Sequence, residues 1–262
     1  MGTIERQYTE ELYKRYGGYF AAWDPGVKYQ LGDYGILKDK TIFERYGNIT
    51  TDFGVNFEVT ELSSPGNLSF CSEGINKVLI DNEATINNLS LPITKTKVGI
   101  NLSFENEKSM ILETFGIKEY GIKNINDLAK KIKEQFTQNN WELDYAIIVS
   151  IKKADSETVI ITNQEKASIE LRAEINTNII PLDVTTLNIA DASLNWGIAQ
   201  EKNCTYKFVA EGELTPLFKL FGLKKSFLKR KVKAIYFKGT GANRLDVNNK
   251  TPLVFKEIKV VF

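Results

Sequence analysis

The sequence predicts an α+β fold: a twisted, mostly antiparallel sheet with two main helices and extended amphipathic hairpins. Three observations support this. Many short segments alternate apolar and polar residues with a period of two, two segments repeat apolar residues at helical spacing, and turn-forming residues separate them. No internal repeat, low-complexity tract or linker interrupts the 262 residues, so we expect one domain over residues 1–262.

The two helices are predicted over residues 4–16 and 126–139. The first places an apolar side chain at every fourth position, at Ile4, Tyr8, Leu12 and Tyr16, before Gly17-Gly18 ends it. The second has the same spacing at Leu128, Ile132 and Phe136, with Asn126 as the expected cap. Asp127 in its first turn is favourable to the helix dipole.

Short strands with turn residues between them account for the first part of the chain. We expect strands at Val27–Leu31, Tyr34–Leu37, Thr41–Arg45, Asn56–Leu62 and Leu68–Cys71. Lys38-Asp39-Lys40 is the expected hairpin connection, and residues 82–88 are expected to form a loop.

The clearest amphipathic strand is Lys97–Glu105. Its apolar positions are Val98, Ile100, Leu102 and Phe104, and they alternate strictly with polar or small residues. A polar turn at residues 106–108 leads to the strand-like run Met110–Ile117, and we expect these two strands to form a long hairpin.

A second alternating strand is predicted at Ser168–Asn176. Its apolar positions are Ile169, Leu171, Ala173 and Ile175. Before it, Tyr145–Lys152 is expected to turn at Ala154-Asp155-Ser156 into Thr158–Thr162. Further strands are expected at Leu194–Ile198, Thr205–Ala210, Val232–Phe237 and Leu253–Phe262, with Leu217–Leu223 as a short helix or an apolar loop tip.

Alternation in these strands has two interpretations. In an antiparallel sheet of a soluble protein, one face packs on the core and the other faces water. A strand that crosses a membrane in about 9–11 residues has the same pattern, apolar toward lipid and polar toward a lumen. Residues 97–105 and 168–176 are each nine residues long, and the pattern alone does not separate the two interpretations.

Positive charge is concentrated near the end of the chain. Nine basic residues and no acidic one lie between Leu214 and Leu245: Lys219, Lys224, Lys225, Lys229, Arg230, Lys231, Lys233, Lys238 and Arg244. Since the whole chain has a formal charge of +1, the other residues together carry −8. Apolar pairs such as Leu217-Phe218 and Phe227-Leu228 interrupt the run. This mixture suits a membrane with anionic head groups, a nucleic-acid backbone or simply a solvated face.

Several function classes are disfavoured by what the sequence lacks. It contains no histidine, which removes the commonest general base and the His-containing metal sites. Cys71 and Cys204 do not form a C-x-x-C pair, so we expect no metal site. We expect two buried thiols, with a disulfide between them as the alternative. Gly239-Thr240-Gly241 lacks the third glycine of a nucleotide-binding loop. We predict no catalytic residues, no metal, no cofactor and no enzyme activity.

The amino-terminal sequence and the hydropathy predict a cytosolic origin. MGTIERQYTEEL lacks the apolar region of a secretory signal, and no run of about 18 apolar residues is present. We therefore expect the protein to be cytoplasmic when soluble. No helix-turn-helix, zinc-finger or RNA-recognition pattern is found, so no specific nucleic acid is expected as a partner.

Three stretches resemble the pore-forming amino-terminal domain of the gasdermin family. The first is KVGINLSFENEKSMILETFGI (97–117), the second LDYAIIVSIKKADSETVIITNQEKASIELRAEI (143–175) and the third NNKTPLVFKEIKVVF (248–262). The first is similar to the hairpin that converts to membrane-crossing strands in that family. The second is similar to the segment in which a Tyr-rich strand and an alternating hairpin precede the second pore hairpin, and the third to the closing strand of the pore domain. The opening helix and strand pair, residues 4–37, also fit by position, so the resemblance extends over most of the chain by order of elements.

The resemblance implies a membrane pore-former that causes cell death in defence. Such a protein binds acidic phospholipid through its basic residues, oligomerises with copies of itself or a related chain, and inserts two hairpins as a β-barrel pore. It is membrane-associated when active, and an inhibitor or a protease is a further expected partner. Two family features have no counterpart here: an inhibitory segment after the final strand, and a cysteine before Cys71 that could be acylated. The alternative is a module that binds anionic lipid or nucleic acid and never inserts.

Overall fold

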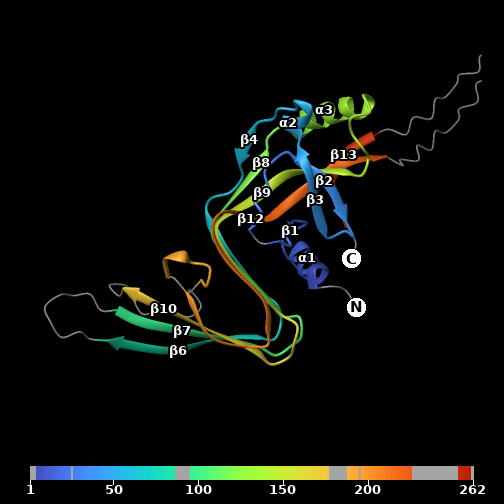
Figure 1. The fold of residues 1–262 in the computed structure, drawn as a ribbon. Helices are drawn as coiled ribbons and strands as arrows, with labels where there is room; N and C mark the ends of the chain where they lie inside the picture. The colour runs from blue at the N-terminus through green and yellow to red at the C-terminus, as the bar shows by residue number, and fades with distance from the viewer. Residues whose placement is uncertain are drawn as a thin grey trace, which may run out of the picture.

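The computed structural model describes residues 4–24, 26–85, 95–176, 188–194, 196–225 and 253–260. Figure 1 shows long curved strands that run from a body carrying the helices to a smaller sheet at the other end. The α+β class, with mostly antiparallel strands and two substantial helices, is confirmed.

Both predicted helices form because one face of each is buried. Helix α1 (Ile4–Arg15) buries Tyr8 and Leu12. It ends at Gly17 and Gly18, whose φ angles of 61° and 85° are in the left-handed region that glycine enters without steric cost. Helix α3 (Ile125–Thr137) buries Leu128 and Ile132.

The expected cap of the second helix is wrong. Helix α3 starts one residue earlier than Asn126, so Asn126 lies inside its first turn, and the residue at the cap position is Asn124. A short helix that was not predicted, α2 (Ile49–Phe53), is capped by Asn48, whose side chain accepts a hydrogen bond from the Thr50 amide at 3.0 Å.

The strands form two sheets. Sheet A has nine strands: β1 (Phe20–Ala21), β2 (Asp33–Lys38), β3 (Ile42–Asn48), β4 (Val59–Glu61), β5 (Gly66–Cys71), β8 (Met110–Ile122), β9 (Tyr145–Thr162), β12 (Cys204–Lys225) and β13 (Leu253–Glu257). Sheet B has four: β6 (Ile75–Thr85), β7 (Lys95–Phe104), β10 (Ala167–Asn176) and β11 (Gly197–Lys202).

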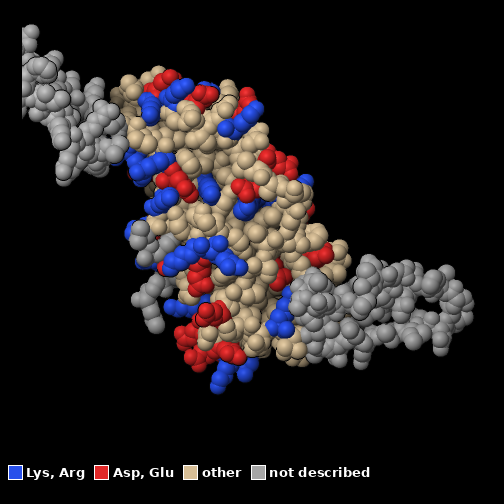
Figure 2. Space-filling model, turned by 180° about the vertical axis from the view of Figure 1, so that it is seen from behind, with Lys and Arg blue, Asp and Glu red and all other residues tan. Residues whose placement is uncertain are grey.

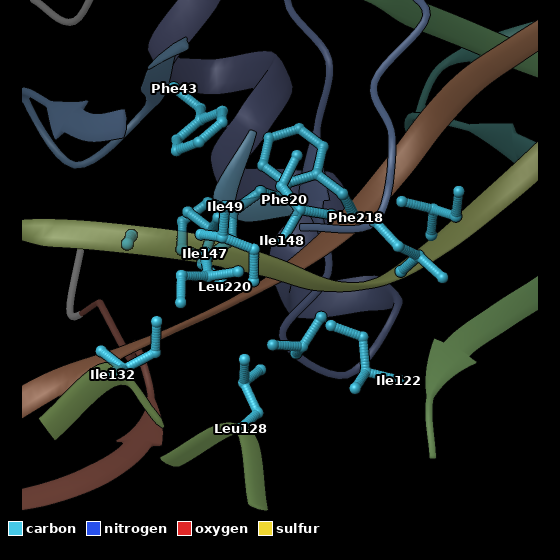
Figure 3. Close-up of a cluster of buried hydrophobic side chains, with 14 of the residues drawn as sticks. Phe20, Phe43, Ile49, Ile122, Leu128, Ile132, Ile147, Ile148, Phe218 and Leu220 are labelled. Atoms are coloured by element: carbon cyan, nitrogen blue, oxygen red, sulfur yellow. The ribbon is translucent and has the colours of Figure 1, made fainter. Parts of the chain in front are cut away.

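The main core lies in the body, between sheet A and the helices α2 and α3. Figure 3 shows its centre, where Ile147 and Ile148 of β9 and Phe218 and Leu220 of β12 are close together. Phe20, Phe43 and Ile49 pack against them from β1, β3 and α2, and Leu128 and Ile132 from α3. A second cluster joins α1 to the start of β8 and the end of β9 through Tyr8, Leu12, Met110, Leu112, Val159 and Ile161.

Sheet B continues sheet A strand for strand. In sheet A, β12 pairs with β9, β9 with β8, and β8 with β5. In sheet B, β11 pairs with β10, β10 with β7, and β7 with β6. The corresponding strands are also consecutive in the sequence: β5 leads into β6, β7 into β8, β9 into β10, and β11 into β12. The two sheets are therefore one ribbon of four chain segments that bends sharply at its middle.

The bend shows that the predicted hairpin between residues 97–105 and 110–117 is wrong. β7 pairs with β6 and β10, whereas β8 pairs with β4, β5 and β9. The polar residues 105–109 form a corner between the sheets rather than a hairpin turn. The loop expected at residues 82–88 is also wrong in its first half, because β6 extends to Thr85.

Strand β9 is longer than predicted. β9 runs without a turn through Ala154-Asp155-Ser156, since Ser156 pairs with Phe115 on one side and with Glu211 on the other. The chain curves here because β8 and β12 carry glycines with positive φ, Gly116 at 66° and Gly212 at 113°. A Cβ atom at Gly116 would clash with the carboxylate of Asp155.

Other predicted elements need correction. Residues 217–223 are part of β12, not a helix or loop tip, because both neighbouring strands pair with them. Val27–Leu31 is not a strand, and residues 192–194 form a short 3-10 helix before β11. The predicted strand Val232–Phe237 lies outside the described residues.

Candidate functional site

The predicted apolar stripes of both amphipathic strands lie on one face of sheet B. Val98, Ile100, Leu102 and Phe104 of β7 and Ile169, Leu171 and Ala173 of β10 are all buried. The register places Leu102 opposite Ile169 and Ile100 opposite Leu171. The backbone of Ile175 pairs with that of Thr96, and the side chain of Ile175 is not among those that the structure describes. The structure thus brings the two stripes together.

This apolar face is covered by the chain itself. At the corner it meets Ile111 and Ile160, which project from β8 and β9 of sheet A. The segment before β11 covers it further, with Ile189 buried and with Leu194 and Trp196 packed against the same cluster. The corner and the segment before β11 together therefore cover a continuous apolar surface on sheet B.

The opposite face of sheet B is polar. Asn101 and Ser103 alternate with the apolar residues of β7, and Glu170 and Arg172 do so on β10. Arg172 Nε lies 2.6 Å from Glu170 Oε1 in an exposed ion pair. Such a face can line an aqueous space while the other contacts an apolar one.

Each of the four strand continuations contains a residue with positive φ at the corner. These residues are Gly74 at 78°, Lys108 at 59°, Lys166 at 54° and Asn203 at 59°. Left-handed backbone is unfavourable for lysine, and every residue can adopt the extended conformation. The bend therefore depends on left-handed backbone at one position in each of the four connections.

Lys77 departs from the apolar character of this face. It pairs with Leu102 in the register of β6 and β7, and its Nζ lies 3.4 Å from Glu113 Oε1 of sheet A. Glu113 is only 4% exposed. The ion pair thus joins the two sheets across the corner.

The structure describes three of the eight lysine and arginine residues predicted to bind membranes, and they differ in environment. Lys219 Nζ lies 4.5 Å from the centroid of the Tyr19 ring, within a cluster that includes Glu119 and Lys152. Lys224 and Lys225 are exposed at the end of β12, and no ion pair to either is found within the described residues. Lys229, Arg230, Lys231, Lys233 and Lys238 lie outside the described residues.

Lys224 lines a basic pocket of about 760 Å³. Its other charged lining residues are Lys38, Asp39, Lys40, Asp144 and Lys259. Elsewhere, positive and negative side chains are intermixed over the face shown in Figure 2. At this pocket, Lys224 of the predicted basic run lies with three further lysines, Lys38, Lys40 and Lys259.

A buried carboxylate lies where β8, β9 and β12 curve. Glu157 of β9 is 1% exposed, pairs with Thr114 and Ala210 in the register, and neither of its oxygens has a hydrogen-bond partner among the described residues. Burial raises the pKa of Glu157 to about 8. The folded protein therefore holds this group mostly protonated at neutral pH.

Glu113 and Glu157 were missed by the sequence analysis. Glu157 follows three residues that were predicted to form a turn, and no signal in the sequence marks it as buried. Glu113 directly follows the buried run Met110–Leu112, and a charged residue inside an apolar run is the one signal that could have revealed it. The cysteine prediction was wrong for Cys71, which is an exposed free thiol, while Cys204 is free and half-buried.

Comparisons of the chain with known protein families and with curated proteins give no match. Within the described ranges, none of the helices has both the length and the apolar character needed to cross a membrane. Those same ranges contain no group of three or more acidic or cysteine side chains arranged to hold a metal ion.

Proposed function

We propose that this protein is a gasdermin-like pore-former that binds acidic phospholipid, oligomerises and inserts its strands to permeabilise a membrane. In this role it would cause cell death as a defence effector. The proposal includes a cytoplasmic form and a membrane-associated active form, no enzyme activity, and an inhibitor or a protease as a further partner. The observation that carries it is the strand-for-strand continuation of sheet A into sheet B.

Straightening the corners would give two long antiparallel hairpins, over residues 66–122 and 145–225. Each would keep its pairing, because the register within each sheet already has the required order. β6, β7 and β10 have 11, 10 and 10 residues, which matches the about 9–11 residues of a strand that crosses a bilayer.

The energetics also favour lipid as the new partner of the apolar face. Exposing the apolar stripes of β7 and β10 to water would forfeit the hydrophobic contribution of their burial, but hydrocarbon chains replace the lost protein contacts. Lys77 lies three residues from Gly74 at the corner. It would thus be near the membrane surface, where its amine can reach the head groups.

Two further features support docking and assembly. Lys224 and Lys225 are exposed on the body, and each cation near an anionic leaflet contributes about 1 kcal/mol to binding. β6 and β11 are the outer strands of sheet B, so a second copy of this chain could pair with them. Homo-oligomerisation, or assembly with a related chain, is therefore part of the proposal.

The test is leakage of a trapped dye from vesicles with and without anionic phospholipid. We expect leakage that requires anionic lipid and falls as salt rises, because screening weakens surface attraction. The double substitution Lys224→Glu and Lys225→Glu should weaken vesicle binding at least about 30-fold, since two lost cations cost about 2 kcal/mol.

The matched control is Lys130→Glu with Lys133→Glu, which changes the net charge equally on the exposed face of α3. It should bind nearly as the parent does. Binding to anionic vesicles that stay intact would instead indicate the non-inserting module, and the absence of binding would contradict the proposed lipid partner.

A further inference from the structure

The chain just before β11 crosses the apolar face of sheet B and is anchored to sheet A. We call residues 188–194 together with Trp196 the strap. Figure 1 shows the orange segment with β11 beside the sheet formed by β6, β7 and β10. Ile189 of the strap is 2% exposed and fills the corner between the apolar stripe of sheet B and Ile111 and Ile160.

Four hydrogen bonds fix the strap to β8 and β9. The Ile189 amide donates to Glu113 Oε2 at 2.7 Å, and Asn188 Nδ2 donates to the Thr114 carbonyl at 2.9 Å. From β9, Thr158 Oγ1 donates to the Ile189 carbonyl at 3.2 Å, and Ser156 Oγ donates to the Ala190 carbonyl. Ser156 and Thr158 are both buried, so these bonds are shielded from water.

The strap has internal bonds that keep this shape. The Ala190 amide donates to Asn188 Oδ1 at 2.8 Å, and Trp196 Nε1 donates to the Asn188 carbonyl at 3.3 Å. Asn188 therefore holds the strap together: it contacts β8, the residues Ala190 and Asp191 just before η2 (Ala192–Leu194), and Trp196 beyond it.

Glu113 joins three parts of the molecule. One carboxylate oxygen accepts from the strap, and the other lies 3.4 Å from Lys77 of sheet B, while the residue itself belongs to sheet A. The contact with Lys77 connects sheet A to sheet B across the corner, and the contact with Ile189 connects sheet A to the strap. Straightening the ribbon requires that they break together.

We infer that the strap is an autoinhibitory element that keeps the ribbon bent and its apolar face covered. This inference rests on the proposed pore function, and it adds the step that controls it: release of the strap from Glu113, Ser156 and Thr158 precedes insertion. It also identifies the site where a regulating partner or a change in solvent would act on this chain.

The experiment compares the parent with Ser156→Ala/Thr158→Val, which removes two anchoring hydroxyls, and with the milder Asn188→Ala. The control is Ser103→Ala/Ser168→Ala, which removes two hydroxyls from the polar face of sheet B. Amide hydrogen exchange is measured without membrane, and dye leakage is measured from anionic vesicles.

Both strap variants should exchange the amides of β7 and β10 at least about tenfold faster, while the amides of β2 and β3 in the body keep their protection. Their leakage should start sooner than that of the parent and the control. Protection in sheet B that is unchanged, or lost equally in β2 and β3, would overturn the inference.

The two measurements separate the two proposals. If the parent leaks dye and the loosened variants leak no faster, the strap is not a regulator, although the pore function stands. If the variants loosen sheet B and no form of the protein ever causes leakage, the pore function is rejected, and the strap as its regulator is rejected with it.

Discussion

Replacing Glu157 with Gln should raise the free energy of unfolding by about 3 kcal/mol at pH 7. Its pKa is raised to about 8 in the folded protein, from an ordinary value of 4.5, because the carboxyl is buried. At pH 7 the unfolded chain releases this proton and the folded chain mostly keeps it. Ionisation of Glu157 therefore stabilises the unfolded state of the parent by about 3 kcal/mol, and glutamine removes this effect.

The sign of the effect gives a characteristic pH profile. Below about pH 4.5 both states bind the proton, and the parent and the variant should have similar stability. The parent then loses stability as the pH rises through the window between about 4.5 and 8. The difference from the variant grows to about 5 kcal/mol above that window.

Denaturant unfolding at pH 4, 7 and 9 measures this profile. Glu134→Gln, at an exposed position of α3, serves as the control and should change stability little at any pH. Parent and Glu157→Gln curves that stay parallel from pH 4 to 9 would show that Glu157 does not carry a buried proton.

The second large effect is expected from the backbone of the corners. Lys108 and Lys166 have φ angles of 59° and 54°. Glycine adopts this conformation freely, whereas a β-branched residue resists it and prefers the extended strand. The pair Lys108→Val/Lys166→Val should therefore straighten more readily than the pair Lys108→Gly/Lys166→Gly, and both pairs lose the same two charges.

Left-handed backbone costs a residue with a side chain about 1–2 kcal/mol at each position, so the valine and glycine pairs differ by about 3 kcal/mol in the free energy of straightening. This difference predicts dye leakage roughly 100-fold faster for the valine pair. Asp39 and Lys40 provide the control, because they have φ angles of 49° and 62° in the β2–β3 turn of the body. Valine there should lower stability without accelerating leakage. Equal leakage rates for the valine and glycine pairs at the corners would contradict the straightening step.

The sequence was sufficient to predict the parts of the fold that depend on local periodicity. Both main helices appear where apolar residues recur at every fourth position, and β7 and β10 appear where apolar residues alternate. The stripes of these two strands are buried as alternation requires, for example at Leu102 and Ile169. Alternation determines which side chains share a face, and that much was correct.

Strand partners could not be predicted in the same way. The residues between Phe104 and Met110 suit a hairpin turn as well as a corner, and only contacts distant in sequence decide between them. Thr162 shows this, since its amide donates to the Ser109 carbonyl at 2.9 Å and fixes the corner. The continuous strand through Ala154-Asp155-Ser156 has the same origin, because pairing on both sides overrides the local turn preference.

The arrangement of the candidate site was not predicted. The structure pairs the apolar stripes of β7 and β10, whereas the sequence analysis paired residues 97–105 with 110–117. The basic residues that the structure describes are not one surface: Lys219 lies over the Tyr19 ring, and Lys224 lines the pocket with Lys259. The strap could not be found from sequence. Its function depends on Asn188 and Glu113, which are 75 positions apart and show no shared motif.

The central claim is that sheet B moves away from the body with its strand pairing intact and becomes a straight extension of sheet A. The most direct test is a distance between two spin labels, at Asn101→Cys on sheet B and Lys133→Cys on α3, with Cys71→Ser and Cys204→Ser to remove the native thiols. We predict that this distance lengthens by at least about 10 Å when anionic vesicles are added, because the seven residues from Asn101 to Lys108 at the corner span about 23 Å when extended. A distance that stays unchanged on vesicles that are leaking dye would contradict the account.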